Sequence, residues 1–125
     1  YCMGEHIYFV AKDHIFIYYQ DEIDVIDVPG ENRIKSSVAL DELLICTFES
    51  NVGDKSFVLR GTKFFEISNS DLINPIVVFE DGSKKIVIDN FGEFFEFQQN
   101  GNAYQFVLLA WKKHLLNQEC GIIAR

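Results

Sequence analysis

Short runs of β-branched and aromatic residues, separated by turn signals, follow one another along most of this chain. Such residues suit a pleated sheet, and their regular spacing is typical of antiparallel strands joined by hairpins. The clearest hairpin signal is Asp81-Gly82, because Asp-Gly tolerates the positive φ angles of a type I′ turn. We therefore predict about eight or nine short strands. They cover residues 6–11, 14–19, 23–28, 43–49, 56–60, 63–68, 76–80, 84–88 and 93–98.

The segment from Asn102 to Gly121 has a different pattern. Asn102 is a residue type that caps helices, and Gly121 suits the left-handed position just after a helix. We predict a helix over residues 102–120 that packs on the sheet. The predicted fold is therefore α+β, mostly antiparallel β with one long C-terminal helix. The apolar residues that recur at helical spacing are Ala103, Tyr104, Val107, Leu108, Ala110, Trp111, His114 and Leu115.

Two of the predicted strands, at residues 15–17 and 76–79, are apolar on both faces. Strands of this kind are expected to be covered on each side. One helix covers only one face, so the sheet is expected to curl or to pack as a sandwich. Residues 31–37 are polar and are predicted to form a loop. Residues 38–50 are ambiguous between a short helix and a short turn, and we favour a turn followed by a strand.

The chain has 125 residues, which predicts a single domain over residues 1–125. Its first residues lack the basic start and apolar run of a signal peptide, and no apolar stretch is long enough for a membrane helix. Cys2, Cys46 and Cys120 are widely spaced and odd in number, which favours a reducing compartment over a disulfide framework. A cytoplasmic protein is therefore expected.

No sequence motif for catalysis, metal binding or cofactor binding is present. His6 and His14 flank the first predicted hairpin without the spacing of a metal pair, and His114 falls on the apolar face of the predicted helix. No nucleophile elbow or phosphate-binding glycine cluster occurs. We expect a protein that is not an enzyme, with no cofactor and no metal. A ligand cavity inside a curled sheet is an alternative.

The formal net charge of −8 is concentrated in the first half of the chain. Residues 1–54 contain eleven acidic and three basic residues, whereas residues 55–125 contain eight of each. Binding to nucleic acid requires cations that displace phosphate counterions, so this distribution argues against it. A basic protein partner, or a role in solubility alone, is favoured instead.

Five acidic residues lie within the eleven residues 21–31. One interpretation is an edge strand that charge keeps from aggregating. The other is a recognition surface for a basic protein, in which aromatic anchors assist the carboxylates. The residues predicted to bind the partner are Asp21, Glu22, Asp24, Asp27, Glu31, Asp41 and Glu42, with Tyr18 and Tyr19 as anchors.

A small, acidic, single-domain protein without catalytic machinery resembles the immunity proteins of bacterial toxin–immunity systems, such as contact-dependent growth inhibition. The resemblance rests on size, charge and missing chemistry, and on no motif. It implies a cytoplasmic monomer or homodimer that binds a basic toxin domain, such as a nuclease, and blocks its active site without contacting nucleic acid or membrane. The alternatives are a ligand-binding β-barrel and a structural or oligomeric domain from a phage or a secretion apparatus.

Overall fold

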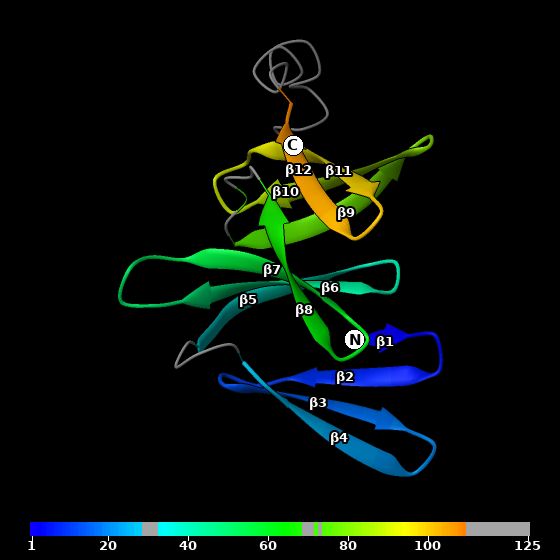
Figure 1. The fold of residues 1–125 in the computed structure, drawn as a ribbon. Helices are drawn as coiled ribbons and strands as arrows, with labels where there is room; N and C mark the ends of the chain where they lie inside the picture. The colour runs from blue at the N-terminus through cyan, green and yellow to red at the C-terminus, as the bar shows by residue number, and fades with distance from the viewer. Residues whose placement is uncertain (29–32, 69–71, 73, 110–125) are drawn as a thin grey trace, which may run out of the picture.

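The computed structural model describes residues 1–28, 33–68, 72 and 74–109, and all regular structure in this part of the chain is β (Figure 1). Twelve strands form two sheets within these residues. The first four strands are β1 (Cys2–Met3), β2 (His6–Val10), β3 (His14–Tyr19) and β4 (Glu22–Asp27). The next four are β5 (Arg33–Leu40), β6 (Leu43–Glu49), β7 (Lys55–Arg60) and β8 (Lys63–Ser68). The last four are β9 (Pro75–Asp81), β10 (Lys84–Asp89), β11 (Phe94–Asn100) and β12 (Ala103–Leu108).

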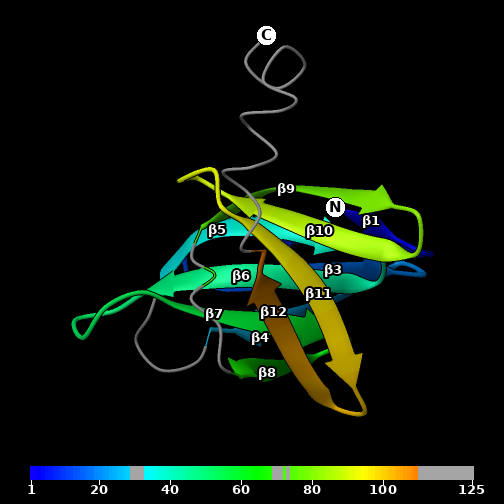
Figure 2. The same ribbon diagram turned by 90° about the horizontal axis from the view of Figure 1, so that it is seen from above.

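The smaller sheet is an antiparallel meander with the order β1-β2-β3-β4. The larger sheet has the order β5-β6-β7-β8-β12-β11-β10-β9, and its one parallel pair joins β8 to β12. This sheet curls until β5 and β9 approach each other, so that it is a nearly closed, barrel-like sheet (Figure 2). In Figure 1 the small sheet lies below β5–β8, and β9–β12 lie above them.

Polar side chains connect the crossover before β9 to β6 and β7. Asn74 donates its backbone N–H to Thr47 Oγ1 at 2.9 Å, and Ser56 Oγ donates to the carbonyl of Leu72 at 2.7 Å. Thr47 and Ser56 share a further hydrogen bond of 2.8 Å between their hydroxyls. Each buried hydroxyl therefore has partners for both donation and acceptance, which removes the desolvation cost of burying it.

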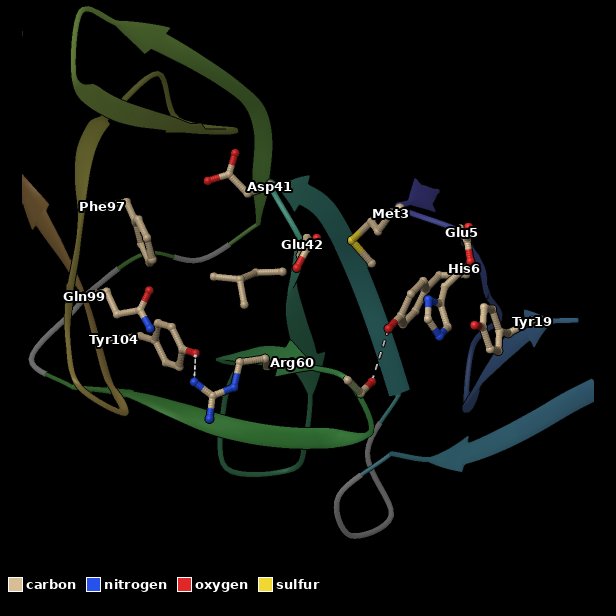
Figure 3. A pocket seen from close by; sticks show the side chains of 14 residues that line it. Met3, Glu5, His6, Tyr19, Asp41, Glu42, Arg60, Phe97, Gln99 and Tyr104 are labelled. Carbon is tan, nitrogen blue, oxygen red and sulfur yellow. Dashed lines mark hydrogen bonds between the residues drawn. The ribbon is translucent and has the colours of Figure 1, made fainter.

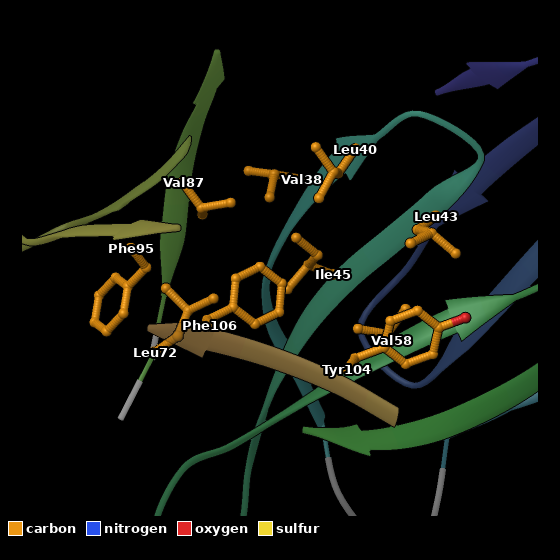
Figure 4. Close-up of a cluster of buried hydrophobic side chains, with 10 residues drawn as sticks. All are labelled: Val38, Leu40, Leu43, Ile45, Val58, Leu72, Val87, Phe95, Tyr104 and Phe106. Carbon is orange, nitrogen blue, oxygen red and sulfur yellow. The ribbon is translucent and has the colours of Figure 1, made fainter. Parts of the chain in front are cut away.

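β6 is the centre of the molecule because all its side chains except that of Glu49 are buried, on both faces of the strand. Alternation along a strand sends Leu43 and Ile45 to one side and Leu44 and Cys46 to the other. The first pair faces the interior of the barrel-like sheet, where the buried cluster in Figure 4 lies, and the second pair faces the small sheet. The interior cluster contains Val38, Leu40, Leu43, Ile45, Val58, Leu72, Val87, Phe95, Tyr104 and Phe106. The cluster between the sheets contains Met3, Tyr8, Ile15, Ile17, Val28, Leu44, Cys46, Phe48 and Leu59.

Cys46 is a structural residue in this core. It is fully buried, and burial raises the pKa of its thiol to about 12. Only the thiolate is nucleophilic, so this side chain is unreactive at neutral pH and serves as a small apolar group. Cys2 is exposed, and Cys120 lies outside the described residues.

The predicted helix over residues 102–120 is wrong where the structure describes it, and the α+β prediction fails with it. Residues 103–108 form β12, whereas residues 110–120 lie outside the described part. Tyr104 and Phe106 are two positions apart and both buried, as expected for alternate residues of a strand, while Leu108 is exposed. The apolar residues of this segment fit both the helical and the strand spacing, and pairing with β11 makes the segment a strand. Gly101, with a φ of 63°, begins the two-residue turn to β12, and this Gly-Asn hairpin signal outweighs the cap assigned to Asn102.

Other local predictions also change. The loop predicted at residues 31–37 is wrong from Arg33 onwards, where β5 begins, and no short helix forms at residues 38–44. The predicted hairpin between β9 and β10 is present, but its turn residues are Gly82 and Ser83. Gly82 alone of the two has a positive φ, which is the pattern of a type II′ turn and not of type I′. No helix in the described residues could span a membrane.

Candidate functional site

The outer face of the small sheet, directed away from the larger sheet, carries six apolar or aromatic side chains in register. Ile7 pairs with Tyr18 and Tyr18 with Ile23 across β2, β3 and β4. The next row consists of Phe9, Phe16 and Val25. We call these six residues the outer apolar face.

Four members of the outer apolar face are strongly exposed: the exposed fractions are 56% for Phe9, 37% for Phe16, 64% for Ile23 and 55% for Val25. The solvent-facing side of an antiparallel sheet is normally polar. A contiguous apolar patch there is typical of an interaction site, whereas scattered single residues would need no explanation. The arrangement can bury aromatic and aliphatic groups against a partner.

Carboxylates stand at the margin of the outer apolar face. Asp21 accepts a hydrogen bond of 2.9 Å from the hydroxyl of Tyr18. His14 lies between Asp13 and Asp27, with its two ring nitrogens 2.9 Å and 3.2 Å from their carboxylate oxygens. An apolar centre with a charged rim is the usual anatomy of a protein–protein interface.

The structure divides the residues that the sequence predicts for partner binding. Tyr18, Asp21 and Asp27 lie at the outer apolar face. Glu22 and Asp24 are exposed on the same strand but point to the other side of the sheet, since they pair with Tyr19 and the buried Ile17. The remaining residues are Tyr19, Asp41 and Glu42, which line a cleft, and Glu31, which lies outside the described residues.

The cleft has a volume of about 920 Å³ and opens where turns from both sheets meet (Figure 3). His6 stacks on Tyr19 at one end, with ring centroids 4.2 Å apart, and Phe97 stacks on Tyr104 at the other. The remaining lining residues are Met3, Gly4, Glu5, Tyr8, Asp41, Glu42, Leu43, Arg60, Gly61 and Gln99.

The charged groups of the cleft differ in their partners. Arg60 donates to the Tyr104 hydroxyl at 3.0 Å and to Asn102 Oδ1 at 3.1 Å, and its guanidinium lies 4.6 Å from the centre of the Phe65 ring. Asp41 forms an ion pair with Lys85. Glu5 and Glu42 have no ion pair within the described part of the chain. The cleft therefore has carboxylates and aromatic rings available for a cation.

Tyr8 connects the cleft to the core between the sheets. Its hydroxyl donates to the carbonyl of Gly61 at 3.3 Å. Burial raises the pKa of Tyr8, and the negative charge of Glu42 raises this pKa further. Tyr8 therefore stays neutral at physiological pH and serves as a hydrogen-bond donor.

Sequence reasoning missed the apolar members of the outer face: Ile7, Phe9, Phe16, Ile23 and Val25. The signal was present, because β2 and β3 carry apolar residues on both faces, and β4 carries Ile23 and Val25 at alternate positions. The strands at residues 15–17 and 76–79 are expected to be covered on both sides, whereas the described residues leave Phe16, Ile76, Val77 and Phe79 exposed.

No group of His, Cys, Asp and Glu within the described residues has the arrangement of a metal site. Comparison with models of protein families, with curated proteins and with solved structures found no match. A functional assignment therefore depends on the geometry of the outer apolar face and the cleft.

Proposed function

We propose that this protein is an acidic binding protein that docks a basic protein partner through the outer apolar face. The supporting observation is the in-register array of six apolar or aromatic side chains, four of them exposed, with carboxylates at its margin. Residues 1–28, which form the small sheet, contain six acidic residues and one basic residue. The apolar centre selects a protein surface, and the surrounding charge selects a cationic one.

The two parts of this surface have different roles in binding. Aromatic side chains such as Phe9, Phe16 and Tyr18 are the anchors that dominate interface energies when a partner desolvates them. Carboxylates at the rim contribute less affinity, but they accelerate association with an oppositely charged partner. We therefore expect the apolar array to supply most of the side-chain contribution to affinity, and the acidic residues to raise the association rate.

The specific form that we propose is an immunity protein of a toxin–antitoxin pair, acting in the cytoplasm. A nuclease lines its substrate groove with cations that hold phosphates. An acidic, aromatic surface that occupies such a groove blocks substrate binding without any chemistry of its own. The size of the chain and its net charge of −8 fit this role.

Affinity capture from the native host tests the proposal. Val25→Asp places a charge in the outer apolar face, and Val77→Asp is a matched control on β9, where that valine is 44% exposed. We expect the wild type and Val77→Asp to retain the same basic protein, which forms a defined complex with the chain once both are purified. Val25→Asp is expected to lose it, with affinity at least about tenfold weaker, or about 1.4 kcal/mol. Equal retention by Val25→Asp, or a complex with an acidic partner only, would contradict the proposal.

The cleft supports a second candidate function, the binding of a small organic cation. Its volume of about 920 Å³ is in the range of ligand sites, and Glu42 is available there. Phenethylammonium combines an ammonium group with an aromatic ring and is a suitable probe. Calorimetric titration is expected to show binding that Glu42→Gln weakens about tenfold. The control Glu49→Gln removes a carboxylate outside the cleft lining, and equal effects of the two variants would reject this candidate.

A further inference from the structure

β4 forms one edge of the small sheet, and within the described residues it pairs only with β3. Every second residue of such an edge leaves its backbone N–H and C=O without a strand partner. Five of the six side chains of β4 are exposed, and only Ile26 is half-buried. In the part of the chain that the structure describes, nothing covers this edge along its length of about 20 Å.

The side chains of β4 are sorted by face. Ile23 and Val25 belong to the outer apolar face, whereas Glu22 and Asp24 point to the opposite side. A strand added along this edge would continue both patterns. Its residues next to Ile23 and Val25 would be apolar, and those next to Glu22 and Asp24 would be cationic.

The charge of β4 also decides which strand can be added. Glu22, Asp24 and Asp27 make three of its six residues acidic. Pairing with a second copy of β4 would bring two such sets of carboxylates into one ribbon, and like charges across a strand pair are destabilising. The acids therefore oppose self-association, which is their usual role at an edge, while they favour a cationic strand.

We infer that the partner binds by adding an extended segment to the edge of β4, with lysine or arginine alternating with apolar residues. In this mode of recognition backbone hydrogen bonds add to the affinity that the apolar side chains supply, and alternate side chains supply specificity. The inference rests on the proposed function and specifies how the basic partner is recognised. About six residues of the segment would span β4.

Two designed peptides test the inference, one alternating valine with lysine and the other alternating valine with glutamate. Nuclear magnetic resonance is expected to show binding of the lysine peptide alone, with slower hydrogen exchange at the outward-pointing amides of β4. N-methylation of alternate residues of the lysine peptide removes backbone donors and keeps its charge. It is expected to weaken binding at least tenfold. The variant carrying Glu22→Lys and Asp24→Lys is expected to reverse the peptide preference, so that it binds the glutamate peptide and not the lysine peptide.

The failures of the two proposals are distinguishable. If N-methylation leaves the affinity of the lysine peptide unchanged, addition to the edge is overturned, while docking of a basic protein on the outer apolar face still stands. If sedimentation shows that the wild type is a dimer with protected β4 amides in the absence of peptide, the edge inference is also overturned. If Val25→Asp retains the captured partner as well as the wild type does, the proposed function fails, even where the peptide binds at β4.

Discussion

Replacing Leu44 or Ile45 by alanine is expected to lower the free energy of unfolding by about 3 kcal/mol in each case. Both side chains are fully buried, although they are neighbours in sequence. Ile45 faces the interior of the barrel-like sheet, and Leu44 faces the core between the two sheets. Each truncation loses the transfer free energy of the deleted methyl and methylene groups and leaves a cavity in a different core.

Urea denaturation, followed by circular dichroism, measures both losses. The control is Ile23→Ala, because this isoleucine is exposed on the outer apolar face and its truncation is expected to change stability by less than about 0.5 kcal/mol. A large effect of Ile45→Ala combined with none of Leu44→Ala would mean that the small sheet does not pack on β6. The converse result would contradict the packed barrel interior.

Reversing the charge of Asp24 and Asp27 to lysine is expected to slow association with the basic partner at least about tenfold at low salt. Each reversal changes the formal charge by two, so the net charge of the chain goes from −8 to −4. Both residues lie on β4, Asp27 at the margin of the outer apolar face and Asp24 on the opposite side of the sheet. Long-range attraction to a cationic surface is screened by salt, so the variant is also expected to lose most of the salt dependence of its association rate.

Stopped-flow or surface-binding kinetics over a series of salt concentrations give these rates. The control variant carries Asp81→Lys and Glu96→Lys, which makes the same change in net charge on β9 and β11. Equal slowing by the two variants would show that total charge, and not its position, governs association. Unchanged kinetics in the Asp24 and Asp27 variant would leave those acids with a role in solubility alone.

The strands could largely be predicted from the sequence, because alternation and turn residues are local signals. The failure at residues 103–108 shows the limit of that reasoning. Tyr104 fits a helix when it is grouped with Val107 and a strand when it is grouped with Phe106, and the hairpin with β11 makes the segment a strand. The seam between β5 and β9 depends on contacts such as the 3.3 Å hydrogen bond from Ser36 Oγ to Asn74 Oδ1, which no local pattern predicts.

The candidate site shows the same division between local and long-range information. The acids of β4 are close in sequence, but strand alternation sends Glu22 and Asp24 to one side and Asp27 to the other. Asp41 and Tyr19 are distant in sequence, and only the meeting of turns from two sheets brings them to one cleft. The outer apolar face was within reach of sequence reasoning, since alternation along β2, β3 and β4 gives each of these strands an apolar outer face.

Methyl-selective nuclear magnetic resonance of the chain, with and without the captured basic partner, tests the docking surface most directly. The account predicts that the methyl signals of Ile7, Ile23 and Val25 shift or broaden on binding, because they belong to the outer apolar face. The signals of Ile76 and Val77, exposed on β9, are expected to stay unchanged. Changes confined to Ile76 and Val77, with Ile7, Ile23 and Val25 unaffected, would contradict it.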